Sequence, residues 1–216
     1  MIKKILLLIF AAVFSVVAAH GQAANTAKEN TPVEKPPLAC GIVVDNSGSF
    51  RMIFETVIKS TNQIIGANNA DDETFLVRFT DASKIFLIQD FTSSKDELQS
   101  AAEGMFVEGG QTAILDSVYF SAKHLAEKDV TANRRKILIL ITDGEDRKSA
   151  AKIEEVLKFL KDEKIRVFTL GLSDGKIYKN LLEKLAKETG GKSFIVEKRS
   201  EIEAIVKQLT AAVRAQ

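Results

Sequence analysis

The chain has 216 residues, of which 45% are apolar and 27% are charged, and its formal net charge is +1. This composition is typical of one folded domain with a well-filled core. A net charge so close to zero indicates no strongly basic face, which argues against nucleic acid as a partner.

The first 23 residues have the layout of a secretory signal peptide. Lys3 and Lys4 precede an apolar run from Ile5 to Ala19, and small residues follow at Gly21 and Ala23. We expect cleavage after Ala23, with Ala19 as the alternative, and therefore a secreted or periplasmic protein. The other interpretation is an uncleaved membrane anchor, although the run falls short of the ~20 apolar residues that span a bilayer.

Residues 24–37 are polar and contain all three prolines, which predicts a flexible linker before a folded domain over residues 38–216. The single cysteine, Cys40, excludes an internal disulfide. We expect it to be a buried, inert thiol beside a strand. A reactive thiol is one alternative. A lipid-modified cysteine is another, but the charged residues 28–37 separate Cys40 from the apolar run.

From Leu38 onward, strand patterns and helix patterns alternate. Continuous apolar runs predict buried parallel strands over residues 38–44, 137–141 and 166–172. Residues 74–79 and 84–89 read as two strands with a connection short enough to force an antiparallel hairpin. A last short strand is expected over 193–196.

Helical periodicity places apolar residues on one face of six segments between these strands. They begin near Phe50, Ser94, Ile114, Ile153, Ile177 and Ser200. The pairs Ser94 with Glu97 and Ser200 with Glu203 match the capping box, in which a serine opens a helix and a glutamate follows three residues later. The second helix should end at Gly104.

This alternation implies right-handed crossovers and an α/β fold. We expect a doubly wound, mostly parallel central sheet with one antiparallel edge strand and helices on both faces. Folds of this kind bind ligands beyond the carboxyl ends of their strands. The sequence therefore directs attention to the polar residues that follow the buried strands.

Oxygen-bearing side chains occur at three such places. The run Asp45-Asn46-Ser47-Gly48-Ser49 follows the first strand, Thr112 opens the third helix, and Asp143 follows the strand 137–141. Oxygen ligands suit a hard divalent cation, and Mg²⁺ keeps some of its waters in near-octahedral geometry. We therefore predict a Mg²⁺ site, with Mn²⁺ and Ca²⁺ as alternatives, at Asp45, Ser47, Ser49, Thr112 and Asp143.

Over residues 38 to the C-terminus the chain resembles the von Willebrand factor type A (VWA) domain. The metal-ion-dependent adhesion site (MIDAS) of that family has the pattern Asp-x-Ser-x-Ser, a distant Thr and a distant Asp, which is matched here by Asp45-Asn46-Ser47-Gly48-Ser49, Thr112 and Asp143. The resemblance implies that Ser47, Ser49 and Thr112 contact the metal through hydroxyls. It implies that Asp45 and Asp143 do so directly or through water. It also implies that the cation docks an acidic residue of a protein partner. Together with the signal-peptide pattern, this predicts an exported adhesion module, and we expect no enzymatic activity.

Simpler interpretations exist for several of these residues. Asp45–Ser49 and Thr112 could each be no more than a helix start. Glu108, Glu145 and Asp146 read as solvated charges at the rim, and Asp116 as a partner of the helix dipole. Gly109-Gly110 lacks the spacing of a phosphate-binding loop, so no nucleotide is expected.

Two other functions are alternatives to a binding module. A Mg²⁺-dependent hydrolase of the phosphatase type would need a second carboxylate at the position of Ser47, to work as acid and base. A metal-free scaffold for protein assembly would not need the complete set of ligands. We expect the domain to be monomeric.

Overall fold

The computed structural model describes residues 35–128 and 133–215. The expected signal peptide and residues 24–34 of the expected linker lie outside this part of the chain. The strands are β1 (Leu38–Asp45), β2 (Glu73–Phe79), β3 (Ile85–Thr92), β4 (Arg135–Thr142), β5 (Arg166–Gly171) and β6 (Ser193–Ile195). The α-helices are α1 (Phe54–Gly66), α2 (Lys95–Glu103), α3 (Ile114–Glu127), α4 (Ile153–Asp162), α5 (Lys179–Glu188) and α6 (Ile202–Ala215). The 3-10 turns include η1 (Gly48–Phe50) and η3 (Arg199–Glu201).

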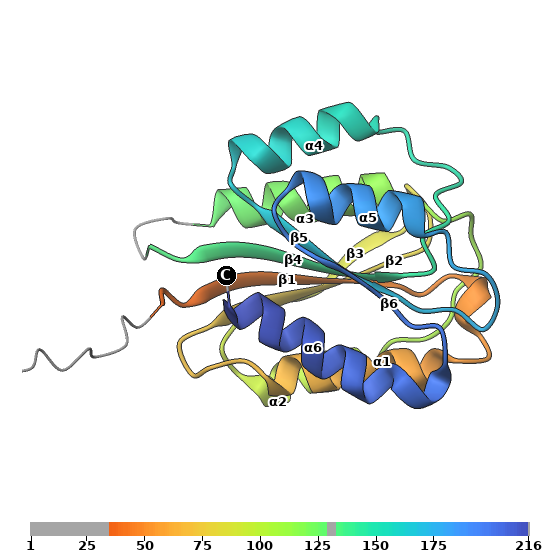
Figure 1. Ribbon diagram of the computed structural model, residues 1–216, viewed down its shortest axis with the longest axis horizontal. Coiled ribbons are helices and arrows are strands. Elements are labelled where there is room, and N and C mark those ends of the chain that lie inside the picture. The colour runs from red at the N-terminus through yellow and green to blue at the C-terminus, as the bar shows by residue number, and fades with distance from the viewer. Residues whose placement is uncertain (1–34, 129–132, 216) are drawn as a thin grey trace, which may run out of the picture. The chain divides into compact units, whose positions relative to one another are not determined.

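The six strands form one sheet in the order β3-β2-β1-β4-β5-β6 (Figure 1). Every neighbouring pair is parallel except β2 and β3, so β3 is an antiparallel edge strand, as predicted. Strand order reverses between β1 and β4, and ligands of doubly wound sheets bind at this switch point. We call the edge where the parallel strands end the carboxyl edge and the opposite one the amino edge.

Helices cover both faces of the sheet, with α1, α2 and α6 on one side and α3, α4 and α5 on the other (Figure 1). Alternate residues of β1 point to the two sides. Ile42 and Val44 join the core under α1 and α6, and Val43 joins the core under α3. Because β1 is buried on both faces, its sequence is apolar without alternation. Within the described residues, no helix is long and apolar enough to cross a bilayer.

Helix ends differ from the expectations in three places. The first helix, expected from near Phe50, begins at Phe54, because Phe50 lies in the 3-10 turn η1. At α2, the Ser94 hydroxyl accepts a hydrogen bond from the Glu97 amide at 3.3 Å, and Gly104 is the C-cap, as predicted. The capping box expected at Ser200 is wrong, because Ser200 lies inside η3 and the Glu203 carboxylate pairs with Lys59 at 2.7 Å. The segment beginning at Ile177 also starts later than expected, since α5 opens at Lys179.

The cap of α2 gives a stability test. Replacing Ser94 with alanine removes the acceptor of the Glu97 amide, so we expect the free energy of unfolding to fall by about 1 kcal/mol. Chemical denaturation measures this change. Ser93→Ala is the matched control, since no cap bond involves that neighbouring hydroxyl in the structure. Equal losses in the two variants would contradict the assignment.

Candidate functional site

The first group of predicted site residues lies where β1 ends. Asp45 is the last residue of the strand and is fully buried, and Ser47 is 2% exposed. Ser49 lies in η1 and is exposed. The Ser47 amide donates a hydrogen bond to Asp45 Oδ1 at 2.9 Å, which folds the chain back over the strand end. Ser47 is the N-cap of η1 and Ser49 lies inside it, so this turn places both serines directly after Asp45 and before α1 begins at Phe54.

The other two predicted residues reach the same place from different loops. Asp143 follows β4, the parallel neighbour of β1, and is 5% exposed. Thr112 precedes α3 and is 6% exposed. The Thr112 carbonyl accepts hydrogen bonds from the amides of Arg147 and Lys148 at 2.9 and 3.1 Å. Thr112 is thus tied by its backbone to the loop that carries Asp143.

Short contacts connect the three hydroxyl side chains. The hydroxyl oxygens of Ser47 and Ser49 are 3.2 Å apart, and Thr112 Oγ1 lies 3.5 Å from Ser47 Oγ. The Ser49 hydroxyl also lies near enough to the Asp143 carboxyl group to favour its charged form. Three loops that are distant in sequence therefore bring two carboxylates and three hydroxyls together at the switch point of the carboxyl edge.

Burial dominates the electrostatics of the two carboxyl groups. It raises the pKa of Asp45 to about 7, although hydrogen bonds from Ser47 and Thr142 favour the charged form, and the nearby Asp143 raises that pKa further. Burial also raises the pKa of Asp143 above its ordinary value. Two carboxylates placed close together in a desolvated site stabilise a cation between them, because a cation offsets both desolvation and mutual repulsion.

Three further residues shape the site and were not predicted to do so. The Thr142 hydroxyl donates to Asp45 Oδ2 at 2.7 Å and accepts from the Gly144 amide at 3.2 Å. Asn46 Nδ2 donates to the Phe106 carbonyl at 2.8 Å. Asp146 Oδ1 accepts from the Ile114 amide at 2.8 Å, so it caps α3 instead of being solvated at the rim. The sequence could have indicated Thr142 and Asn46, because each is the neighbour of one of the two predicted aspartates.

Asp116 also departs from its simple interpretation. Its two carboxylate oxygens accept from the amides of Ala150 and Ala151 at 2.9 and 2.8 Å. These bonds fasten the loop after Asp143 to the first turn of α3. The carboxylate therefore holds the third loop of the site in place.

The donor set fits a hard divalent cation. All five side chains offer oxygen, and one carbonyl oxygen beside them, Asn46 Oδ1, is buried without a hydrogen-bond partner. Across residues 35–128 and 133–215, no three His, Cys, Asp or Glu side chains are placed to hold a metal together. A cation here would depend on hydroxyls as much as on carboxylates.

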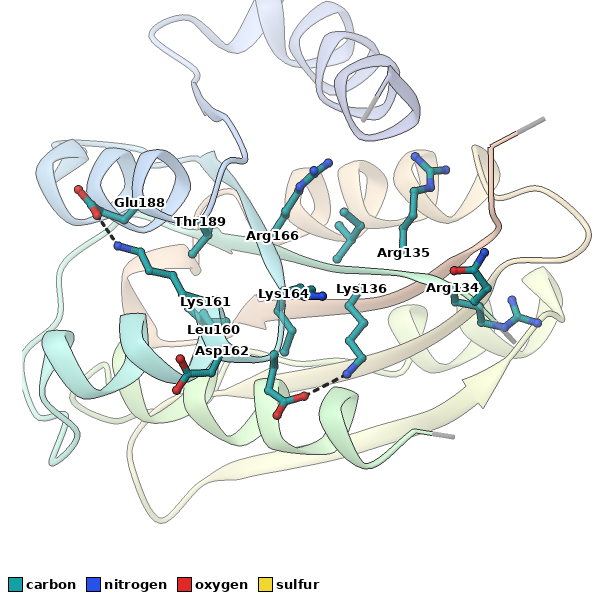
Figure 2. A pocket seen from close by; sticks show the side chains of 14 residues that line it. Arg134, Arg135, Lys136, Leu160, Lys161, Asp162, Lys164, Arg166, Glu188 and Thr189 are labelled. Carbon is teal, nitrogen blue, oxygen red and sulfur yellow. Dashed lines mark hydrogen bonds and ion pairs between the residues drawn. The ribbon is translucent and has the colours of Figure 1, made fainter. Parts of the chain in front are cut away.

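A large pocket of about 780 Å³ lies at the amino edge, far along the strands from Asp45 (Figure 2). Three of the charged residues that line it, Arg135, Lys136 and Lys161, make hydrogen bonds or ion pairs with other parts of the protein. Lys136 pairs with Glu163 at 3.1 Å, and Lys161 pairs with Glu188 at 2.6 Å (Figure 2). Arg135 Nε donates to the Pro36 carbonyl at 2.8 Å, where the chain enters β1. These contacts join β4 to the end of α4, α4 to α5, and β4 to the segment before β1. The pocket has none of the predicted site residues.

Comparisons with known proteins agree with this fold. The family model of the von Willebrand factor type A domain matches residues 41–208. A search of curated proteins found no match to the chain.

Solved structures with the same fold have low sequence identity to this chain. An aerotolerance-related membrane protein from Bacteroides fragilis, solved with multiple mutations to serine, is 15% identical with a TM-score of 0.66, covering 83% of this chain and 100% of that one. Proximal thread matrix protein 1 from the mussel byssus, with a zinc-occupied MIDAS motif, is 18% identical with a TM-score of 0.70, covering 83% and 48%. The pilus adhesin SpaC from Lactobacillus rhamnosus GG is 14% identical with a TM-score of 0.64, covering 83% and 30%.

The match to the family model extends from β1 through most of α6, and so includes all three loops of the site. Domains of this family are in general interaction modules. The chain belongs to the von Willebrand factor type A domain family.

Proposed function

We propose that the protein is an exported binding module that docks an acidic side chain of a protein partner on a divalent cation. The cation would be held by Asp45, Ser47, Ser49, Thr112 and Asp143. Mg²⁺ is the first candidate, and Mn²⁺ and Ca²⁺ remain alternatives for the same oxygen ligands. Export rests on the signal-peptide pattern of residues 1–23.

The observation that carries this proposal is the convergence of five oxygen donors from three loops. Ser47, Thr112 and Asp143 are almost entirely buried, whereas Ser49 is exposed. A cation bound among them would be enclosed by the protein below and open to a ligand above. When bound, it would supply a positive charge that attracts a carboxylate oxygen from outside.

Each residue has a distinct part in such a site. The hydroxyls of Ser47, Ser49 and Thr112 would coordinate without neutralising charge, and Asp45 and Asp143 would balance the cation. Thr142 orients Asp45 through its 2.7 Å hydrogen bond and keeps one carboxylate oxygen in a fixed position. The zinc-occupied MIDAS of the mussel protein supports the choice of a divalent cation, and the adhesin with the same fold supports a binding role.

The residues present give little support to a hydrolase. Ser47 cannot act as a general acid or base in place of a carboxylate. Cys40 is a buried residue of β1, and burial raises the pKa of its thiol to about 12. His124 is held by Asp90 at 2.8 Å and stacks on Phe91. Cys40 and His124 are thus engaged in packing or pairing, and neither belongs to the candidate site.

Calorimetric titration with Mg²⁺ tests the proposed ligands. Asp45→Ala and Thr112→Ala should each weaken Mg²⁺ binding, with a loss of about 100-fold or more for Asp45→Ala, because it removes one of the two charges that balance the cation. Thr142→Ala, which removes the hydrogen bond that orients Asp45 but no proposed ligand, should weaken Mg²⁺ binding about 10-fold. Asp71→Ala is the control, an exposed carboxylate outside the site. Mg²⁺ affinity that is the same in all four variants would disprove the site.

The raised pKa of Asp45 predicts a pH dependence of stability in the metal-free protein. The folded state binds this proton more tightly than the unfolded state, whose carboxyl has a pKa near 3.8. The contribution of Asp45 to stability is therefore greatest below about pH 4, is lost as the pH rises towards 7, and stays lost above it.

Asp45→Asn removes this ionisation while keeping the size of the side chain. In EDTA above pH 7 we expect the variant to be more stable than the wild type by as much as ~4 kcal/mol, the free energy to which this pKa change corresponds. Below pH 4 the two should be nearly equal. Thermal denaturation across the pH range measures this, with Asp71→Asn as the control. A variant that is less stable at every pH would refute the assigned pKa.

A further inference from the structure

Two exposed aromatic side chains beside the candidate site have no role in the core. In the described part of the chain, four large apolar side chains are exposed: Met52 by 75%, Phe106 by 56%, Phe86 by 41% and Phe120 by 39%. Phe86 lies on β3, and Phe106 lies in the loop between α2 and Thr112. Exposed large apolar side chains that cluster on a surface indicate a contact with another molecule.

Phe86 and Phe106 are clustered by Arg78, whose guanidinium carbon lies 4.5 Å from the centre of the Phe86 ring and 4.8 Å from that of Phe106. We call this arrangement the Phe86–Arg78–Phe106 stack. Arg78 is only 14% exposed and pairs with Glu108 at 2.8 Å, and Lys84 pairs with the same carboxylate at 3.2 Å. Cation–π contacts and ion pairs hold both rings in place before any partner arrives. Side chains that are already ordered lose less entropy on binding.

The stack is fastened to the residue that follows Asp45. In the sheet, Arg78 is paired with Val44, which precedes Asp45. The Phe106 carbonyl accepts from Asn46 Nδ2 at 2.8 Å, and the Glu108 amide donates to the Asn46 carbonyl at 2.8 Å. The loop that carries Phe106 therefore lies directly against the first loop of the site, and one ligand can touch both.

We infer that the Phe86–Arg78–Phe106 stack is a second contact for the same partner. It binds an apolar or aromatic side chain of the partner, close in sequence to the acidic residue that docks on the cation. An extended segment advances ~3.3 Å per residue. A side chain roughly two to four positions from the acidic residue would then reach the rings. This inference rests on the proposed function, because the acidic residue is placed by the cation.

The charges around the stack are balanced. Arg78 and Lys84 carry two positive charges, and Glu108 and Asp81 beside them carry two negative charges. The hydrogen bonds from Arg78 and Lys84 hold the pKa of Glu108 below its ordinary value, so its carboxylate stays ionised. The paired charges leave the two rings as the contact that the stack offers, which suits an apolar side chain, and the acidic residue of the segment is placed by the cation alone.

The test is a selection of short random peptides with one fixed Asp or Glu on the immobilised protein, in Mg²⁺ and in EDTA. Peptides recovered only in Mg²⁺ should be enriched in Phe, Tyr, Trp, Leu or Met at a position roughly two to four residues from the fixed acid. For one such peptide, Phe106→Ala should raise Kd about 10-fold, and Phe86→Ala should also weaken binding. Mg²⁺ affinity should not change in either variant.

Phe120→Ala is the matched control, since this ring is as exposed as Phe86 but lies on α3. It should leave peptide binding intact. Mg²⁺-dependent peptides without the apolar preference, or equal binding by all three variants, would overturn the inference and leave the metal site standing. If no recovered peptide depends on Mg²⁺, the proposed function fails and this inference fails with it.

Discussion

The parallel pairing of β1 with β4 is the constraint on which the structure of the site depends. It places Asp45 and Asp143 at the ends of neighbouring strands, both directed to the carboxyl edge. Burying two carboxyl groups so close together opposes folding, and the rise of both pKa values expresses that cost. The apolar strands below supply the compensating stability, because β1 and β4 are covered by helices on both faces.

The loops that complete the site are held by hydrogen bonds of both backbone and side chains. Asp143 is followed by Gly144, which has a φ of 86° and a position where a Cβ atom would lie 2.3 Å from the Tyr178 carbonyl oxygen. The Tyr178 amide in turn donates to the Asp143 carbonyl at 2.7 Å. A glycine is therefore required for the close approach of these two loops.

Much of the fold could be predicted because its signals are local. Uninterrupted apolar runs such as Ile137–Ile141 mark central parallel strands, and the short connection between residues 79 and 85 allows only an antiparallel neighbour. The five expected site residues are likewise brought together by strand ends that the pattern locates. Their proximity follows from the doubly wound topology, and their chemistry remains a proposal.

What escaped prediction depends on contacts between distant segments. Nothing near Asp146 in sequence shows that its carboxylate will meet the Ile114 amide. The local signal at Ser200 and Glu203 indicated a cap, but Glu203 found Lys59 on α1 instead. Arg78 and Phe106 are also far apart in the chain, and only the fold makes them neighbours. Such tertiary contacts can outweigh a local preference for a cap, because one contact contributes a free energy of the same order as one helix cap.

The two ends of the described domain meet at the amino edge, opposite the candidate site. Lys35 Nζ donates to the Ala215 carbonyl at 2.5 Å, and the C-terminal end of α6 lies beside the start of β1 (Figure 1). A pull between the first residue of β1 and a ligand at Asp45 would run along a single strand that is hydrogen-bonded to β2 on one side and β4 on the other. Its ladder bonds would be loaded together in shear instead of opening one after another. If a ligand binds at the candidate site, the placement of that site and of the chain ends would make the fully buried strand β1 the one that carries mechanical tension.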